Sequence, residues 1–217
     1  MNKSLDFVKE VFKNRTIGRI LFHWQVHRYC YGLSGVMVDL ASGSTHPSYS
    51  RYWDIKPAKM IRIDYDPNKK PDIVADLNEP LSLEESLADN VFFFNALYIF
   101  KNPVSVLSEI RRILKPGGKL FLSAPLIFSE SKGPNDYWRF TSEGLRCVLE
   151  SAGFKEIEIK SFGERFSAAA YILHPAFLFN FIRLIFYSLA IFLDQLIPLK
   201  IKKLHPTPIG YFVIAKK

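Results

Sequence analysis

The sequence predicts a single α/β domain built on a doubly wound, mostly parallel sheet of seven strands. Two observations carry this prediction. Seven short apolar runs have the length of buried strands, and segments with the spacing of amphipathic helices lie among them. Strands and helices that alternate in this way form parallel sheets with helices on both faces. No repeat or low-complexity linker divides the 217 residues, so we expect one domain over residues 1–217.

The first predicted strand shows the pattern that points to a site. Val36–Val38 is a β-branched and apolar run, Asp39 closes it, and the small residues 41–44 allow a sharp turn. A strand followed by such a turn is where an open α/β sheet holds a nucleotide-like ligand. The remaining predicted strands follow in order at residues 59–63, 72–75, 90–94, 119–124, 157–159 and 209–215.

Three helical segments are predicted around these strands. Residues 1–34 form an N-terminal helical region whose apolar positions suit a face packed on the sheet. A second helix covers residues 103–114. A third covers residues 142–152, with Thr141 as its N-cap and Gly153 just past its end.

Composition places the chain among folded proteins of a reducing compartment. Hydrophobic residues make up 48%, which excludes disorder, and the net charge of +8 comes without a dense Lys/Arg run. Two isolated cysteines are too few for a disulfide framework or a zinc site. His23 and His27 stand four residues apart, but no third ligand is near, so no metal site is predicted. The N-terminus lacks the apolar core of a signal peptide, so we expect a cytoplasmic location.

Acidic residues end the first three predicted strands: Asp39, Asp64 and Asp76. The carboxyl ends of parallel strands lie along one edge of the sheet, so these carboxylates are expected to converge on one crevice. A carboxylate at the second strand end can accept from both hydroxyls of a ribose, and one at the third can meet the amine of adenine. Each aspartate alone is equally well explained as a loop start or a helix cap. The first turn lacks a Lys and a phosphate-binding Gly pattern, so a nucleoside with an uncharged or zwitterionic tail fits better than a triphosphate.

From Val36 to Phe154 the chain resembles the class I S-adenosylmethionine-dependent methyltransferases, most closely the group called type 11. The matching motifs are Val36-Met-Val-Asp-Leu-Ala-Ser-Gly43, Ile61-Arg-Ile-Asp64, Asp72-Ile-Val-Ala-Asp76, Asn95-Ala-Leu-Tyr-Ile-Phe-Lys-Asn-Pro103, Leu107-Ser-Glu-Ile-Arg-Arg-Ile-Leu-Lys-Pro-Gly-Gly-Lys-Leu120 and Ser151-Ala-Gly-Phe154. The fifth is the most specific, because a helix, a Lys-Pro-Gly-Gly stop and a strand follow in fixed order. The resemblance implies a Rossmann-like methyltransferase fold, methyl-transfer activity and S-adenosylmethionine as cofactor.

The resemblance also implies a role for individual residues. The cofactor-binding positions carried over from the family are Asp39, Ala41, Ser42, Gly43, Asp64, Tyr65, Asp76, Leu77, Asn95 and Leu97. The first four would lie against the methionine part of the cofactor, while Asp64 would hold the ribose and Asp76 the adenine amine.

Two departures from the family pattern affect this assignment. Ala41 and Thr45 stand where the first motif usually has glycine, which implies a tighter turn or weaker cofactor binding. Tyr98 and Ile99 follow Leu97 where the family often has Glu and His, so no catalytic base is assigned.

The loop at residues 133–141 combines polar and aromatic residues at the sheet edge. Family members that modify sugars or lipids at the cell envelope resemble it in a Pro-x-Asp-Tyr-x-Arg-Phe-Thr run. We therefore predict substrate contacts from Asp136, Tyr137 and Arg139, with Asp136 accepting a hydroxyl proton and Arg139 holding an anionic group. The alternative is structural: Arg139 pairs with Asp136 while the neighbouring aromatic rings pack against the sheet.

Residues 163–208 form an apolar helical insertion between the sixth and seventh strands. The run 176–193 would reach about 27 Å as a helix, close to the thickness of a bilayer core. A single crossing is not expected, because the last strand must return to the same sheet. The segment then lies on a membrane, covers the site as a lid, or forms a dimer surface. Residues 200–203, rich in lysine, favour an anionic membrane surface, and we expect deletion of residues 168–198 to leave the sheet folded.

Together these features predict a methyltransferase that acts peripherally at the inner face of a membrane on a small-molecule, sugar or lipid-linked acceptor. The alternative is a degenerate methyltransferase fold that serves as a membrane-associated binding module without catalysis, which the altered first motif favours. Nucleic acid is the least favoured acceptor, since only the loop at residues 49–53 offers aromatic rings for stacking. The sequence decides neither the atom that is methylated nor the oligomeric state.

Overall fold

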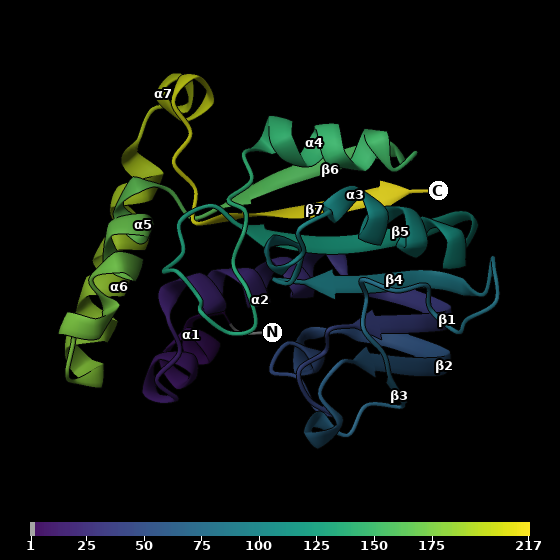
Figure 1. Ribbon diagram of the computed structural model, residues 1–217. Helices are drawn as coiled ribbons and strands as arrows, with labels where there is room; N and C mark the ends of the chain where they lie inside the picture. Colours follow the sequence, from purple (N-terminus) through teal and green to yellow (C-terminus); the bar gives the residue numbers. More distant parts are fainter. Residues whose placement is uncertain (1–2) are drawn as a thin grey trace.

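The computed structural model describes residues 3–217 and contains a seven-stranded sheet with helices on both faces (Figure 1). The strand order is β3-β2-β1-β4-β5-β7-β6. The first five strands run parallel, and β7 is antiparallel to both of its neighbours. The strands are β1 (Tyr31–Leu40), β2 (Asp54–Asp64), β3 (Ile73–Val74), β4 (Ala88–Phe94), β5 (Leu114–Pro125), β6 (Lys155–Phe162) and β7 (Gly210–Lys216). The predicted mostly parallel sheet is confirmed.

Each face of the sheet carries its own hydrophobic core, because alternate residues of a strand point to opposite sides. Val38 and Leu40 of β1 pack in the core under α3 (Pro103–Ile113) and α4 (Ser142–Ser151). Met37 of the same strand packs in the other core, under α2 (Ile17–Tyr29). The remaining helices are α1 (Lys3–Phe12), α5 (Arg165–Ile172), α6 (Asn180–Leu196) and α7 (Leu199–Leu204), with short 3-10 turns η1 (Ser50–Tyr52), η2 (Pro67–Lys69), η3 (Leu97–Ile99) and η4 (His174–Ala176).

Most predicted element ends lie within a few residues of the observed ones. Thr141 caps α4 as predicted, since its hydroxyl accepts from the N–H of Gly144 at 3.1 Å. The predicted helical region 1–34 is wrong at its end, because α2 stops at Tyr29 and β1 begins at Tyr31. Tyr31 pairs with Asp54 at the start of β2, so both strands extend further back than their apolar runs indicate.

The insertion between β6 and β7 folds as α5, α6 and α7, which stand beyond the carboxyl ends of the parallel strands (Figure 1). Its inner side belongs to the core: Tyr187 is fully buried, and the Asp194 carboxylate accepts from three backbone N–H groups at the start of α5. Removing residues 168–198 would uncover this core. These contacts lead us to expect that the deletion destabilises the sheet instead of leaving it folded.

The outer side of the insertion is a continuous run of exposed apolar side chains, here called the apolar outer face. Its members are Leu178, Phe179, Phe181, Ile185, Phe186, Leu189, Phe192, Leu196, Leu199, Ile201 and Leu204. Within residues 3–217, no helix combines the length and the hydropathy needed to cross a bilayer.

Candidate active site

The turn after β1 is drawn toward the end of β2 by a hydrogen bond. Ala41 and Gly43 have left-handed backbone conformations, with φ of 51° and 67°, which reverse the chain within a few residues. The N–H of Gly43 then donates to Asp64 Oδ2 at 2.8 Å, and the N–H of Asp66 donates to Asp64 Oδ1 at 3.0 Å. Asp64 therefore fixes the geometry of both strand ends.

A cavity of about 310 Å³, here called the strand-end cavity, opens at this edge of the sheet. It lies where the strand order reverses between β1 and β4, the position at which open α/β sheets bind ligands. Carboxylates from Asp64 and Asp76 border it, and Leu77, Ile99 and Phe100 give it an apolar side. The other lining residues are Ala41, Gly43, Tyr65, Lys69, Ala75, Asn78, Asn95, Ala96, Tyr98, Gly133, Pro134 and Asn135.

Three of the predicted cofactor residues lie elsewhere. Asp39, Ser42 and Leu97 are buried and do not line the strand-end cavity. The Asp39 side chain is 0% exposed and accepts from the hydroxyl of Tyr49 at 3.0 and 3.1 Å. Burial raises the pKa of Asp39 to about 7, and the Tyr49 hydrogen bond opposes this shift. The expectation that three aspartates border one crevice is therefore corrected to two, because Asp39 points into the aromatic core.

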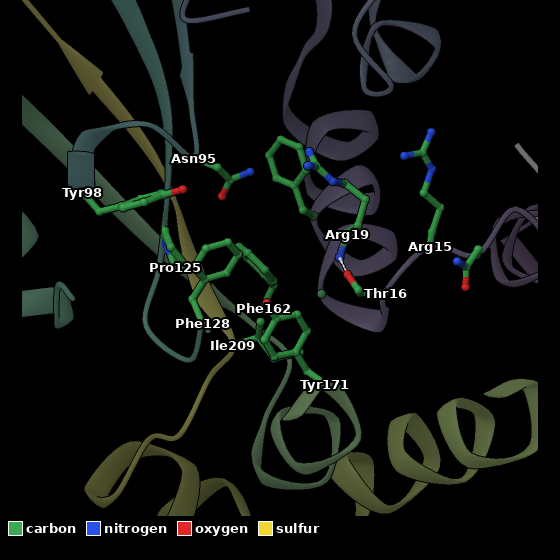
Figure 2. Close-up of a pocket in the computed structure, with 13 residues that line it drawn as sticks. Arg15, Thr16, Arg19, Asn95, Tyr98, Pro125, Phe128, Phe162, Tyr171 and Ile209 are labelled. Atoms are coloured by element: carbon green, nitrogen blue, oxygen red, sulfur yellow. Dashed lines mark hydrogen bonds between the residues drawn. The ribbon is translucent and has the colours of Figure 1, made fainter. Parts of the chain in front are cut away.

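A second cavity of about 370 Å³, here called the helix-side cavity, adjoins the first (Figure 2). Asn95 and Tyr98 line both cavities. Arg15 and Arg19, from the segment that leads into α2 and from its first turn, lie on one side. Aromatic rings form much of the other sides, and the full lining is completed by Asn14, Thr16, Gly18, Phe22, Pro125, Phe128, Phe162, Tyr171 and Ile209.

The tyrosines of the helix-side cavity stay protonated at neutral pH. Burial, followed by the charge of Asp136, raises the pKa of Tyr98. Burial also raises the pKa of Tyr171. Among the residues that the structure describes, no carboxylate or imidazole lines this cavity. Its polar side chains are therefore amides, hydroxyls and guanidinium groups, none of which acts as a base at neutral pH.

The loop at residues 133–141 does not present its charged side chains as free substrate contacts. Arg139 forms two hydrogen bonds with the Asp136 carboxylate, and its guanidinium lies 5.5 Å from the ring centroid of Tyr98. Tyr137 is half exposed, and its N–H donates to the carbonyl of Tyr98 at 2.9 Å. Arg139 and Asp136 are thus paired with each other, as in the structural alternative. The loop reaches the strand-end cavity only through residues 133–135.

Several lining residues were not predicted. Tyr98 lies in the motif that follows the fourth predicted strand, where it only departs from the family pattern, and Lys69 and Asn78 lie a few residues beyond Asp64 and Asp76. Arg15 and Arg19 gave no signal, because they stand in an ordinary amphipathic region and reach the site only through the packing of α2 on the sheet.

The strand order, the antiparallel last strand and the cavity at the switch point agree with a comparison to known families. Residues 37–122 match the family model described as methyltransferase domain. Over these residues the chain is similar to the class I S-adenosylmethionine-dependent methyltransferases, and solved methyltransferase structures share its fold. The predicted Rossmann-like methyltransferase fold is confirmed.

Individual known proteins resemble this chain over part or most of its length. It is 33% identical over 92 residues to a tRNA U34 carboxymethyltransferase of Campylobacter curvus, and the match spans 37% of this chain and 31% of that relative. Among solved structures, an S-adenosylmethionine-dependent methyltransferase from Archaeoglobus fulgidus has a TM-score of 0.58 at 17% identity, covering 92% of this chain and 94% of its own. Phosphoethanolamine N-methyltransferase 2 of Haemonchus contortus, complexed with phosphomonomethylethanolamine and S-adenosylhomocysteine, has a TM-score of 0.55 at 16% identity, over 90% and 52% of the two chains.

The residues of the strand-end cavity fit an adenosyl group chemically. Asp64 is nearly buried, and each of its oxygens accepts one backbone N–H, which leaves lone pairs for ribose hydroxyls. The backbone N–H and the side-chain amide of Asn78 both donate to Oδ1 of Asp76. The apolar side offers hydrophobic side chains against which a purine ring can pack.

Proposed function

We propose that this protein transfers the methyl group of S-adenosylmethionine to a small acceptor bound in the helix-side cavity. The observation that carries the proposal is the wall that the two cavities share, formed by Asn95 and Tyr98. A cofactor in one cavity and an acceptor in the other would meet at these two side chains. Holding two reactants in line supplies much of the rate enhancement of a group transfer.

In this proposal the strand-end cavity holds the cofactor through residues already placed there. Asp64 would accept from the ribose hydroxyls, Asp76 would accept from the adenine amine, and Leu77 would pack on the base. When bound, S-adenosylmethionine supplies an activated methyl group on its sulfonium. The protein then needs to align the acceptor atom, shield it from water and donate hydrogen bonds through Tyr98.

The acceptor that fits best is a small molecule, sugar or lipid headgroup rather than a nucleic acid. The aromatic residues that suggested base stacking are engaged elsewhere: Tyr49 is buried, and Trp53 stacks on Phe92 with ring centroids 4.7 Å apart. The lack of a lining base among the described residues favours an acceptor atom with an available lone pair over a hydroxyl that must first lose its proton.

We further propose that the apolar outer face rests on an anionic membrane. Its apolar side chains on α6 continue into α7, which carries Lys200, Lys202 and Lys203 beside them. Apolar residues next to lysines are the pattern of a helix that lies in the membrane interface. Such a position would bring a lipid-linked acceptor close to Tyr171, which is on the neighbouring α5 and lines the helix-side cavity.

Vesicle binding tests the membrane part of the proposal. The protein should sediment with phosphatidylcholine vesicles that contain phosphatidylglycerol, and less with phosphatidylcholine alone. Ile185→Glu combined with Leu189→Glu should reduce the binding at least about tenfold, because two apolar contacts of roughly 1.5 kcal/mol or more each are lost. Val74→Glu, at an equally exposed site on the far edge strand, is the control. Wild-type protein that stays in the supernatant, or that forms a dimer which the double variant abolishes, would contradict membrane docking.

Cofactor binding separates the enzyme from the non-catalytic module. Calorimetry should show one molecule of S-adenosylhomocysteine bound per chain. Tritium from methyl-labelled S-adenosylmethionine should then appear in a lipid or small-molecule fraction of cell extract. A protein that binds neither form of the cofactor would be the binding module instead.

A further inference from the structure

Two arginines of the helix-side cavity have no acidic partner within residues 3–217. Arg15 and Arg19 both line the cavity, and neither side chain makes an ion pair or a hydrogen bond among the described residues. The Nε of Arg15 is fully buried without an acceptor. In Figure 2, Arg19 extends from α2 toward Asn95 at the wall between the two cavities.

Two carboxylates on the elements around the cavity, Glu10 and Asp136, are bonded by other arginines. Glu10, at the end of α1, is bonded by Arg51 and lies 3.1 Å from Nδ1 of His23. Asp136 is bonded by Arg139. The charges of Arg15 and Arg19 are therefore not neutralised from either side of the cavity.

This arrangement is unfavourable unless something negative enters. Burial, followed by the neighbouring charge of Arg15, lowers the pKa of Arg19. A partly buried positive charge needs a partner to offset its desolvation, and a guanidinium is the group best suited to carboxylate or phosphate oxygens. The cavity also borders the first turn of the 13-residue helix α2, whose N-terminal dipole adds positive potential.

The opposite side of the cavity is aromatic. Phe128 and Tyr171 stack with ring centroids 6.2 Å apart and an interplanar angle of 16°. Together with Phe162 they would accommodate an apolar or ring-shaped body, and Phe22 of α2 adds a further ring beside the arginines. The cavity thus combines positive charge with aromatic surface.

We infer that the methyl acceptor carries an anionic group, a phosphate or a carboxylate, which Arg15 and Arg19 bind. This inference rests on the proposed function and names its substrate class. The arginines hold the anionic end, the aromatic rings contact the body of the acceptor, and the reacting atom lies toward Asn95 and Tyr98. The sequence predicts that Arg139 binds the anionic group. In this inference Arg15 and Arg19 bind it instead, because Arg139 is paired with Asp136.

Small aromatic probes test the inference on the full-length protein saturated with S-adenosylhomocysteine. Phenyl phosphate and benzoate supply the two anions, and phenol is the neutral match. Dihexanoylphosphatidic acid, used below its micelle concentration, presents the same phosphate on a lipid. At least one anion should bind about tenfold or more tightly than phenol, since charge-assisted hydrogen bonds are each worth about 1.5–3 kcal/mol. If dihexanoylphosphatidic acid binds more tightly than the aromatic anions, the anionic group belongs to a lipid headgroup. If phenyl phosphate or benzoate binds more tightly, it belongs to a soluble acceptor.

Variants locate the site. Arg15→Gln and Arg19→Gln should each weaken the anionic probe about tenfold or more and leave phenol within about twofold. Arg28→Gln, an exposed position in the last turn of the same helix, should change nothing. Circular dichroism and the affinity for S-adenosylhomocysteine verify that each variant is folded.

The outcomes separate this inference from the proposed function. If S-adenosylhomocysteine binds but the anions bind no more tightly than phenol, or bind equally well to both arginine variants, the anion site is overturned and the methyltransferase proposal stands. If S-adenosylhomocysteine does not bind, the proposed function fails and the inference fails with it.

Discussion

The two cavities that meet at Asn95 and Tyr98 are built in different ways. The strand-end cavity is lined by turns that follow consecutive parallel strands, apart from residues 133–135. The helix-side cavity gathers residues from the α1–α2 junction, the ends of β4 and β5, and the segments around β6, α5 and β7. The first is acidic at its rim, and the second is positively charged and aromatic. The first cavity depends on neighbouring strand ends, while the second depends on how helices from distant parts of the chain dock on the sheet.

The largest effect on cofactor affinity is expected at Asp64, which bonds the turn after β1 to the end of β2. Asp64→Ala removes the acceptor of the Gly43 and Asp66 N–H groups as well as the proposed ribose contact. The affinity for S-adenosylhomocysteine should fall about 10- to 100-fold, because each lost charged hydrogen bond is worth about 1.5–3 kcal/mol. Calorimetry gives the affinity, and Asp72→Asn, an exposed acid outside this cavity, is the control. Phenyl phosphate affinity that falls equally would show that the two cavities are not independent.

The next effect concerns Asp39, which is buried against Tyr49 rather than exposed to the cofactor. Asp39→Asn should leave the affinity for S-adenosylhomocysteine within about threefold, because the side chain does not line the strand-end cavity. A loss as large as that of Asp64→Ala would restore the three-acid crevice and contradict the structure.

The stability of wild-type protein relative to Asp39→Asn should fall as the pH rises. The pKa of Asp39 is about 7 in the folded protein and about 4 when unfolded, so between these values the folded state holds the extra proton. The stabilisation that this proton gives is complete below about pH 4. It is lost as the pH rises, by about 1.4 kcal/mol per pH unit up to about pH 7. Urea unfolding should therefore show wild-type protein losing stability relative to Asp39→Asn across this range. A constant difference would contradict the raised pKa.

The smallest effect is expected at Ala41, where the family usually has glycine. Its φ of 51° is left-handed, which costs a residue with a Cβ about 1 kcal/mol. Ala41→Gly should raise the free energy of unfolding by up to about 1 kcal/mol and should not weaken cofactor binding. Ala96→Gly, where the backbone is not left-handed, should instead lower it by about 0.5–1 kcal/mol. Denaturant titration of both variants measures the difference.

Sequence reasoning succeeded where structure follows from local pattern. The acids after β2 and β3, the small-residue turn after β1, and the N-cap of α4 each depend on a few neighbouring residues, and the structure places Asp64 and Asp76 at one cavity. It failed for Asp39, because the alternation of side chains along β1 decides which core the residue enters, and Tyr49 comes from a loop whose path no periodicity predicts.

The helix-side cavity could not be foreseen for a related reason. Arg19 and Tyr171 are far apart in the chain, and only the docking of α2 and α5 brings both to the same cavity. The apolar insertion illustrates the same limit. Its composition indicated an exposed apolar surface, but not that Tyr187 on its inner side is fully buried in the core.

A crystal structure of the complex with S-adenosylhomocysteine tests the central claim most directly. The account predicts that the ribose hydroxyls lie within hydrogen-bond distance of Asp64, that the adenine lies beside Leu77, and that the sulfur faces Asn95 and the helix-side cavity. A ligand bound elsewhere, or one whose sulfur points away from the helix-side cavity, would contradict it.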